Sequence, residues 1–164
     1  MFNLRYESWG RKMNAENQAL FARLKQQTME CDLCRLRSGC KQVVFGRGNP
    51  VAKVFFVGEA PGAHEDEQGL PFVGTSGKLL DKLIAAAGFK PEEVYIANVV
   101  KCRPPENRFP LRDEVIACKP YLLKQIELID PLVVITLGAA ATQALIDPKA
   151  KITKVRGMFS DKVC

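Results

Sequence analysis

Three short apolar segments, each followed by a helical pattern, constrain the fold of this chain more than any other feature. They are rich in β-branched and aromatic residues and lie between glycine or proline residues, at 53–57, 94–100 and 132–137. Continuous apolar strands that alternate with amphipathic helices are typical of a parallel sheet with both faces covered. The sequence therefore predicts an α/β fold, a three-layer α/β/α arrangement around a central, mostly parallel sheet.

Helical periodicity predicts the elements around these strands. Helices are expected at 13–30, from Ser76 to a glycine stop at Gly88, at 112–129 and at 139–146. Pro120 must kink or split the third of them, because proline lacks the donor that a helix interior needs. The segments 31–50, 58–74 and 103–110 are predicted loops. The second helix should bury one apolar side, formed by Leu79, Leu80, Leu83, Ile84 and Ala87.

Composition sets broad limits on the class of protein. The 164 residues are 47% hydrophobic, which suits one compact domain over residues 1–164 with a real core. No apolar run reaches the roughly 20 residues of a membrane helix, and the polar first ten residues do not resemble a signal peptide. We therefore expect a cytoplasmic protein without membrane association, and a monomer.

The net charge of +6 suits a polyanionic partner such as nucleic acid, although a basic protein can also lack any such role. The basic residues gather in two stretches of the sequence, which favours the nucleic-acid reading. One stretch holds Lys101, Arg103, Arg108 and Arg112, and the other holds Lys149, Lys151, Lys154 and Arg156.

Several common catalytic motifs are absent from the sequence. The single histidine, His64, cannot form the two-histidine zinc motif and is interpreted as a surface loop residue. There is no nucleophile elbow and no phosphate-binding Walker loop, and the 46–48 segment (GRG) lacks the third glycine of a dinucleotide fingerprint.

Four of the six cysteines suggest a shared metal site. Cys31 and Cys34 form a C-x-x-C pair after the first helix, Cys102 follows a strand, and Cys118 lies on a helix. Four thiolates suit either tetrahedral zinc or a 4Fe–4S cluster, and a redox role for the pair ranks third. The remaining thiols, Cys40 and Cys164, are interpreted as unrelated to this site.

Ligands of open α/β sheets bind at the carboxyl ends of the strands, where the loops 58–74 and 101–110 are expected. These loops contain the segments GEAPG at 58–62, PFVG at 71–74 and NVVKCRPP at 98–105. Together with the four cysteines in register, they resemble the family 4 uracil-DNA glycosylases over residues 31–157. The resemblance implies a glycosylase-like fold, uracil-containing DNA as the partner, and a 4Fe–4S cluster ligated by Cys31, Cys34, Cys102 and Cys118.

The same resemblance implies roles for residues in these loops. Glu65 would activate water, with Glu59 in support, while Asp66 is interpreted as structural. Asn98 would read the uracil edge, because one amide can accept from N3–H and donate to O4. Phe72 would stack on the base. The backbone of the first motif would cradle a uracil oxygen or a phosphate, through Gly58, Ala60, Pro61 and Gly62.

The family pattern continues beyond position 164 into a last strand, a helix and a histidine-containing motif. We therefore expect the chain to bind DNA but to excise uracil poorly, and to expose a sheet edge. Two other functions stay open: an iron–sulfur DNA-binding module without catalysis, and a redox protein that uses its cluster for electron transfer.

Overall fold

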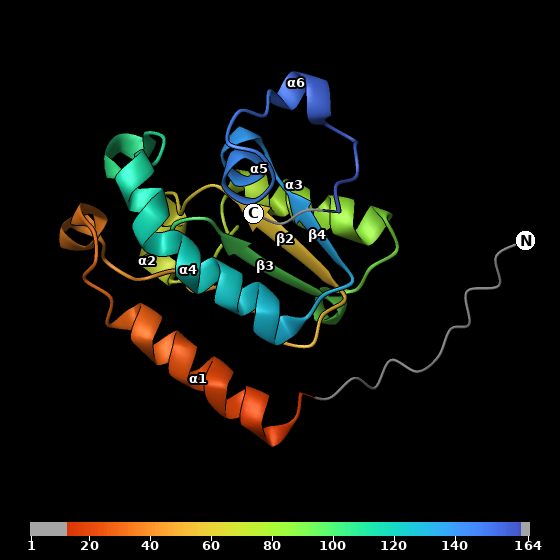
Figure 1. Ribbon diagram of the computed structural model, residues 1–164, viewed down its shortest axis with the longest axis horizontal. Coiled ribbons are helices and arrows are strands. Elements are labelled where there is room, and N and C mark those ends of the chain that lie inside the picture. Colours follow the sequence, from red (N-terminus) through yellow and green to blue (C-terminus); the bar gives the residue numbers. More distant parts are fainter. Residues whose placement is uncertain (1–12, 162–164) are drawn as a thin grey trace, which may run out of the picture.

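A computed structural model describes residues 13–161, which fold around one four-stranded sheet (Figure 1). The strands are β1 (Arg47–Gly48), β2 (Val54–Gly58), β3 (Val94–Asn98) and β4 (Val133–Thr136), in the order β1-β3-β2-β4. β2 pairs in parallel with both β3 and β4, and only the two-residue β1 is antiparallel. The predicted mostly parallel sheet is therefore confirmed.

Helices cover both faces of this sheet. They are α1 (Ala15–Met29), α2 (Ala63–Gln68), α3 (Thr75–Ala86), α4 (Arg112–Ile129), α5 (Ala139–Leu145) and α6 (Ile152–Val155). Short 3-10 turns lie at Arg35–Gly39, Pro91–Glu93 and Pro105–Asn107. Figure 1 shows α4 on one side of the sheet and α3 on the other, with α1 packed outside α4. This is the three-layer α/β/α arrangement expected from the sequence.

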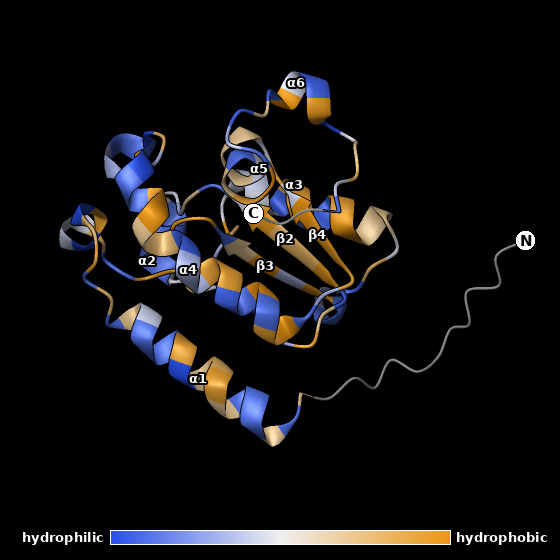
Figure 2. Ribbon diagram, viewed as in Figure 1, coloured by the Kyte–Doolittle hydropathy of each residue, from blue (hydrophilic) through white to orange (hydrophobic). Residues whose placement is uncertain are grey.

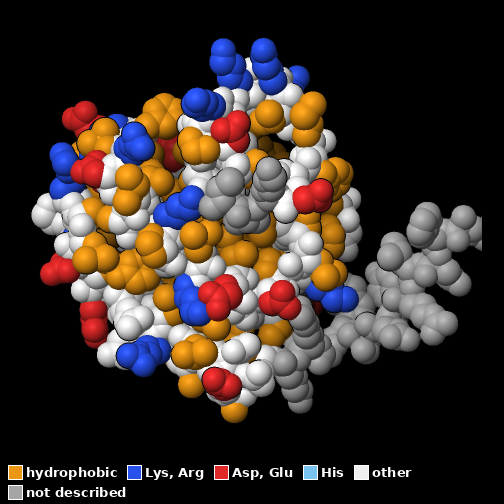
Figure 3. Space-filling model, in the orientation of Figure 1, with side chains coloured by type: hydrophobic (Ala, Val, Ile, Leu, Met, Phe, Trp, Pro, Cys, Tyr) orange, Lys and Arg blue, Asp and Glu red, His pale blue; other side chains and the backbone are white. Residues whose placement is uncertain are grey.

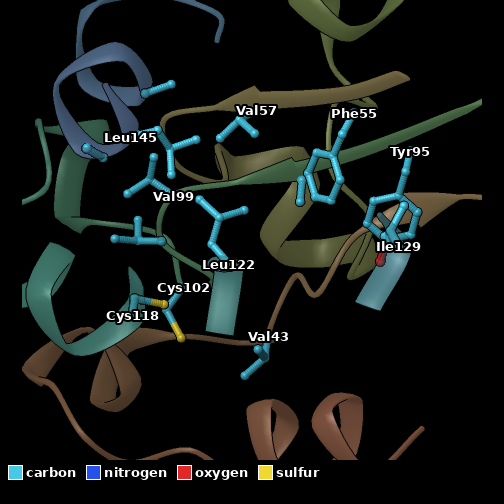
Figure 4. Packing of buried hydrophobic residues seen from close by; sticks show 14 of the residues in the cluster. Val43, Phe55, Val57, Tyr95, Val99, Cys102, Cys118, Leu122, Ile129 and Leu145 are labelled. Carbon is cyan, nitrogen blue, oxygen red and sulfur yellow. The ribbon is translucent and has the colours of Figure 1, made fainter. Parts of the chain in front are cut away.

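Alternate residues of the strands supply the two cores. Phe55, Val57 and Tyr95 point to the side of α4 and α5, where they pack with Leu122 and Leu145 (Figure 4). The intervening strand residues pack against α3 instead, namely Val54, Phe56, Val94 and Ile96. Figure 2 shows the strands as nearly continuous apolar segments, as a sheet buried on both faces requires. Each fully buried aliphatic side chain contributes roughly 1.5–3 kcal/mol to this packing.

The structure corrects the predicted apolar side of α3. Leu80 and Ile84 are buried, but Leu79 and Leu83 are 58% and 59% exposed. Leu80 and Ile84, at positions i and i+4, pack into the core on this face of the sheet, and the neighbouring leucines face outward.

Pro120 does not split α4, which runs unbroken from Arg112 to Ile129. Proline removes one hydrogen bond, the one to the Ile116 carbonyl, and its own ring is exposed. The turns on either side are anchored by the buried Cys118 and Leu122, which hold the helix together across the missing bond.

Two of the predicted loops contain regular structure. β1 lies within the segment 31–50, and α2 lies within the segment 58–74. α2 begins after Gly62, whose N–H donates to the Glu65 carboxylate, and ends at Gly69 with φ of 70°. The glycines at both ends of this short helix made the segment resemble a loop in the sequence, although each of them serves as a helix boundary.

β4 forms the edge of the described sheet and is partly exposed along its whole length. Beside it lies an open groove of about 730 Å³ between β4 and the segment 146–160. In the 13–161 portion, no strand pairs with the outer edge of β4. No helix there is long and apolar enough to cross a membrane.

Candidate active site and cysteine pocket

Asn98 and Gly58 lie side by side at the carboxyl ends of β3 and β2, where the parallel register pairs them directly. Asn98 is 1% exposed. Among residues 13–161, its Oδ1 is the one buried side-chain polar atom without a hydrogen-bond partner. A buried amide oxygen that lacks a partner costs free energy, so this acceptor is available to an incoming donor.

Phe72 closes the other side of this position. A Cβ atom on Gly58 would lie 2.5 Å from Asn98 Oδ1 and 2.5 Å from the Phe72 ring. Only glycine therefore lets the strand end approach both groups. Phe72 itself has φ of 55°, and a Cβ on Gly77 would collide with its carbonyl. The phenyl ring, the amide and the bare backbone of Gly58 thus meet at one point, which is an arrangement suited to a flat, hydrogen-bonding ring.

Arg47 holds the strained Phe72 turn in place. Its Nε donates to the Pro71 carbonyl at 2.9 Å, and Nη2 lies 3.4 Å from the Phe72 carbonyl. The same guanidinium forms an ion pair with Asp81 of α3 at 2.5 Å. β1 and α3 therefore fix the ring position together. This contact could not be predicted from the sequence, because Arg47 lies 24 residues before Pro71 and 34 residues before Asp81.

The two candidate carboxylates have different surroundings. Glu65 accepts hydrogen bonds from the N–H groups of Gly62, Val73 and Gly74, at 3.1, 2.9 and 2.9 Å. Burial acts to raise the pKa of Glu65, but these backbone donors outweigh it and the pKa is lowered. The carboxylate of Glu65 is therefore kept ionised, and it ties the two ends of the motif loop together.

Glu59 follows Gly58 directly and is half-buried. Its carboxylate forms no hydrogen bond or ion pair with any residue of the described part of the chain. Burial raises the pKa of this carboxyl group. Glu59 is thus the less constrained of the two acids, whereas the sequence resemblance favoured Glu65 as the acting group.

The other polar residues of the loop are structural or exposed. Asp66 is 2% exposed and accepts from the Lys41 N–H at 3.0 Å, which supports its predicted structural role. It joins α2 to the cysteine loop. His64 is exposed, as predicted, although it lies on α2 rather than in a loop. Ala60 is partly exposed, while Pro61 is buried beneath the loop.

The four cysteines singled out from the sequence come together in space. Cys31, Cys34, Cys102 and Cys118 line the same cavity, although they come from three separate segments of the chain. Most of the remaining lining is apolar, and Figure 4 shows Cys102 and Cys118 at the edge of the α4-side core. As the side chains stand, no three His, Cys, Asp or Glu residues between 13 and 161 are placed to bind one metal ion.

The electrostatics of this pocket centre on Cys118 and Lys101. Burial raises the pKa of the Cys118 thiol to about 11, while Lys101 opposes the shift by its charge and by its N–H. That N–H donates to Cys118 Sγ at 3.3 Å. Burial likewise lowers the pKa of Lys101 to about 8, and the Cys118 thiolate opposes that shift. A donor of this kind stabilises a thiolate, which is the form that ligates metals.

Cys40 does not line this cavity, although it lies beside Cys102, and its exclusion from the ligand set stays a prediction. A hydrogen bond with Cys102 lowers the pKa of the Cys40 thiol and raises that of Cys102. The turn Arg35–Gly39 brings it there, since it folds the chain back after Cys34. Cys164, the other cysteine set aside, lies outside the described residues.

The first basic stretch is not a free surface patch. Lys101 is 1% exposed, and Arg108 forms two hydrogen bonds, at 2.6 and 2.9 Å, to the fully buried Glu114 carboxylate. The second stretch lies in and beside α6 and is exposed throughout, which Figure 3 shows as Lys and Arg side chains gathered around that helix. In the first stretch Lys101 is therefore enclosed while Arg112 is exposed, whereas all four basic residues of the second stretch are exposed, namely Lys149, Lys151, Lys154 and Arg156.

This fold and this loop arrangement define a known class of protein. The family model of the uracil DNA glycosylase superfamily matches residues 45–160, which include every strand and every helix except α1. The chain belongs to the uracil-DNA glycosylase superfamily.

Within that superfamily the chain is similar to type-4 uracil-DNA glycosylases. It is 47% identical to the enzyme of Thermotoga maritima over 135 residues, which are 82% of this chain and 70% of the relative. It is 45% identical to that of Sulfurisphaera tokodaii over 140 residues, 82% of this chain and 64% of the relative. A type-5 enzyme of Thermus thermophilus is 35% identical over 116 residues.

These matches confirm the family resemblance found in the sequence motifs. They also show that the matched part spans 64% to 70% of the type-4 relatives' length. The cysteine pocket begins at Cys31, ahead of the region that the superfamily model covers. The pocket's first two thiols therefore belong to a segment that the general superfamily pattern does not describe.

Proposed function

We propose that this chain is a DNA-repair glycosylase that excises uracil from DNA by hydrolysing the N-glycosidic bond. The observation that carries the proposal is the buried, unpartnered Oδ1 of Asn98 beside the Phe72 ring and Gly58. Uracil presents a donor at N3 and an acceptor at O4, so one amide can satisfy both. Cytosine presents the opposite pattern and is rejected. Phe72 supplies a face for stacking, worth roughly 1–3 kcal/mol per base.

The uracil of a duplex must leave the stack before it can reach this position. The sugar then develops positive charge while the base departs as an anion. An ionised carboxylate near the sugar stabilises the positive charge and orients the attacking water. The backbone of Gly58, Ala60, Pro61 and Gly62 would cradle a uracil oxygen or a phosphate.

The test is excision from an oligonucleotide that carries one uracil, followed by alkaline cleavage of the abasic site. We expect cleavage only at the uracil position, and none in matched strands with cytosine or thymine there. If the protein bound the oligonucleotide without excising uracil, the second candidate function would be favoured, an iron–sulfur DNA-binding module. The exposed basic surface around α6 supports this candidate. Absence of both binding and excision would refute both proposals.

We further propose that Cys31, Cys34, Cys102 and Cys118 hold a 4Fe–4S cluster. The donor set fits, because four thiols from three segments line one cavity and a backbone N–H already donates to one of them. When bound, the cluster would join the C-x-x-C loop to the end of β3 and to α4. The groups that bind DNA and the base are this chain's own side chains and backbone.

The two loop glutamates should respond differently to replacement by glutamine. Glu59→Gln should lower the rate of excision by about 100-fold while leaving the melting temperature unchanged, because within residues 13–161 the Glu59 carboxylate forms no hydrogen bond or ion pair. Glu65→Gln should lower the melting temperature, because its carboxylate binds three backbone donors. Excision kinetics and thermal unfolding of both variants check this prediction.

The destabilisation of Glu65→Gln should depend on pH. A lowered pKa in the folded state means that the ionised carboxylate stabilises the fold above the unfolded value of about 4.3. That contribution is lost as the pH falls through the folded pKa. The difference between wild type and Glu65→Gln should therefore shrink below about pH 4.3. If Glu65→Gln lost activity with unchanged stability, and Glu59→Gln did not, Glu65 would be the acting carboxylate.

The basic surface around α6 should carry much of the affinity for DNA. Replacing Lys151, Lys154 and Arg156 by serine should weaken binding uniformly across sequences. It should also reduce the slope of log affinity against log salt by roughly 0.9 for each lost phosphate contact on duplex DNA. Fluorescence anisotropy over a salt series measures both effects. A matched control replaces Arg23 and Lys25, exposed cations of α1 at the opposite end of the molecule (Figure 1).

An unchanged salt slope in the α6 variant, with a reduced slope in the α1 control, would place the DNA on the other side of the protein. In that case the basic character of α6 would have no part in binding the phosphate backbone.

A further inference from the structure

Lys101 is a lysine in an unusual setting, fully enclosed behind the base-reading position. Its side chain is 1% exposed, yet none of the carboxylates in residues 13–161 forms an ion pair with it. Its Nζ donates to the main-chain carbonyl of Asn98 at 3.0 Å and to Gln125 Oε1 at 2.6 Å. Both acceptors are neutral, so the positive charge has no counter-charge among these contacts.

The same residue also borders the cysteine pocket. Lys101 lines the cavity, and its backbone N–H donates to Cys118 Sγ at 3.3 Å. Its carbonyl accepts from the Val44 N–H at 2.8 Å, which fixes the peptide between two layers. One residue therefore contacts a predicted cluster ligand through its backbone, and the base-reading residue through its side chain.

Gln125 makes this connection rigid. It is 0% exposed, and its Nε2 donates to the Phe45 carbonyl at 2.9 Å and to the Tyr95 hydroxyl at 3.4 Å. The amide is therefore oriented with Oε1 toward the ammonium group. Because every partner is buried, the Lys101 side chain has one arrangement and cannot turn to solvent without breaking several hydrogen bonds.

A buried ammonium group with only neutral acceptors is costly unless a negative charge lies nearby. Four cysteine thiolates around a 2+ iron–sulfur core carry net negative charge, and the pocket that would hold them adjoins Lys101. A filled pocket would thus supply the lysine with a counter-charge. With an empty pocket, segment 98–102 would lose the charge that balances its buried cation.

We propose that Lys101 is a positioning residue that makes recognition of uracil by Asn98 depend on the occupancy of the cysteine pocket. A filled pocket holds the ammonium group, the ammonium group holds the Asn98 carbonyl, and the amide stays aimed at the base. This inference rests on the proposed function. Coupling between two sites is reciprocal, so uracil bound at Asn98 must in turn stabilise the filled pocket.

The test uses the full chain reconstituted anaerobically with iron and sulfide, and free uracil as the probe. The rate of iron loss to a ferrous-iron chelator is followed by visible absorbance, with and without saturating uracil. In the wild type, uracil should slow iron loss about fivefold or more, within the usual range of site-to-site coupling. In Lys101→Met this protection should vanish. The cluster of Lys101→Met should also have a lower reduction potential, because loss of a positive charge disfavours the added electron.

Two further variants separate coupling from simple damage to the fold. Thr28→Val changes another buried residue that lines the pocket, but within residues 13–161 the Thr28 hydroxyl bonds the Leu24 carbonyl of its own helix and no group of Lys101 or Asn98. It should keep both the protection by uracil and the reduction potential. Lys101→Met combined with Gln125→Leu removes both side chains of the 2.6 Å contact, so Gln125 Oε1 is not left unpaired, and thermal unfolding checks that the variant is folded. It should behave as Lys101→Met does.

The outcomes distinguish this inference from the proposed function. Protection by uracil that persists in both Lys101 variants, with an unchanged potential, would overturn the role of Lys101 and leave the glycosylase proposal intact. A wild type that binds iron but shows no protection by uracil would overturn the coupling itself. Failure of the proposed function appears separately, as lack of excision in the oligonucleotide assay.

Discussion

Replacing Asn98 by aspartate should lower the rate of uracil excision by about 100- to 1,000-fold, the usual cost of removing one preorganised donor. The aspartate has no N–H to donate to O4, and when ionised it repels the negative charge that develops on the departing base. Asn98 is 1% exposed, and burial favours the neutral form of a carboxyl group there. A protonated aspartate could accept from the cytosine amino group, so the preference for uracil over cytosine should also fall.

The measurement compares single-turnover excision of uracil and cytosine from otherwise identical strands. Asn107→Asp is a matched control, because Asn107 is exposed near the same end of the sheet. The Asn107 Oδ1 accepts a hydrogen bond from Arg103 Nε at 2.8 Å, and an aspartate carboxylate at this position can accept the same hydrogen bond. We expect Asn107→Asp to excise uracil as the wild type does. Unaltered excision by Asn98→Asp would mean that this amide does not read the base.

The framework of this prediction could be drawn from the sequence, because strands buried on both faces leave a continuous apolar pattern. Asn98 and Gly58 are the last residues of two such strands, and parallel pairing brings them to the same edge. The prediction that Asn98 is the residue that binds the base came instead from the resemblance of the loop motifs to the family. The strained backbone of Phe72, and the guanidinium of Arg47 that holds it, have no periodic signal in the sequence.

Polar residues in the interior were the hardest to predict. The apolar pattern of α4 identifies Leu122 and Ile129 as core positions, but Gln125 and Glu114 are equally buried on the same helix. A buried polar group is stable only when partners distant in sequence satisfy it, and those partners are known only once the fold is built. Lys101 shows the same limit, since its charge suggested a surface that binds DNA whereas the structure encloses it.

Four of the cysteines could be assigned to one site from the sequence pattern, whereas the place of Cys40 is known only from the fold. The spacing of the C-x-x-C pair, and the motif that contains Cys102, singled out the four thiols that line one cavity. Cys40 could not be assigned from spacing, because only the short turn after Cys34 determines where its side chain points. Cys40 lies beside Cys102 without lining the cavity, so replacing Cys40 and Cys118 in turn tests the predicted ligand set.

Cys118→Ser should remove the cluster, whereas Cys40→Ser should retain it. After anaerobic purification we expect about four iron per chain in the wild type and in Cys40→Ser. Cys118 is buried, lines the pocket and accepts the Lys101 N–H, so its replacement removes a thiolate ligand from the centre of the site. Cys40 does not line the cavity, and its contact with Cys102 is one that a serine hydroxyl can also make.

Loss of the cluster should destabilise the fold as well as bleach the protein. The proposed ligands join the loop after α1 to the end of β3 and to α4. Without the cluster, no metal–thiolate bonds would hold the loop after α1 against α4. Iron and zinc analysis, visible absorbance and thermal unfolding of wild type, Cys118→Ser and Cys40→Ser measure the metal content, the colour and the stability. Stoichiometric zinc without iron in the wild type would contradict the cluster assignment. Equal loss of iron in Cys40→Ser and Cys118→Ser would instead place Cys40 among the ligands, and one of the four thiols chosen from the sequence would then be released from that role.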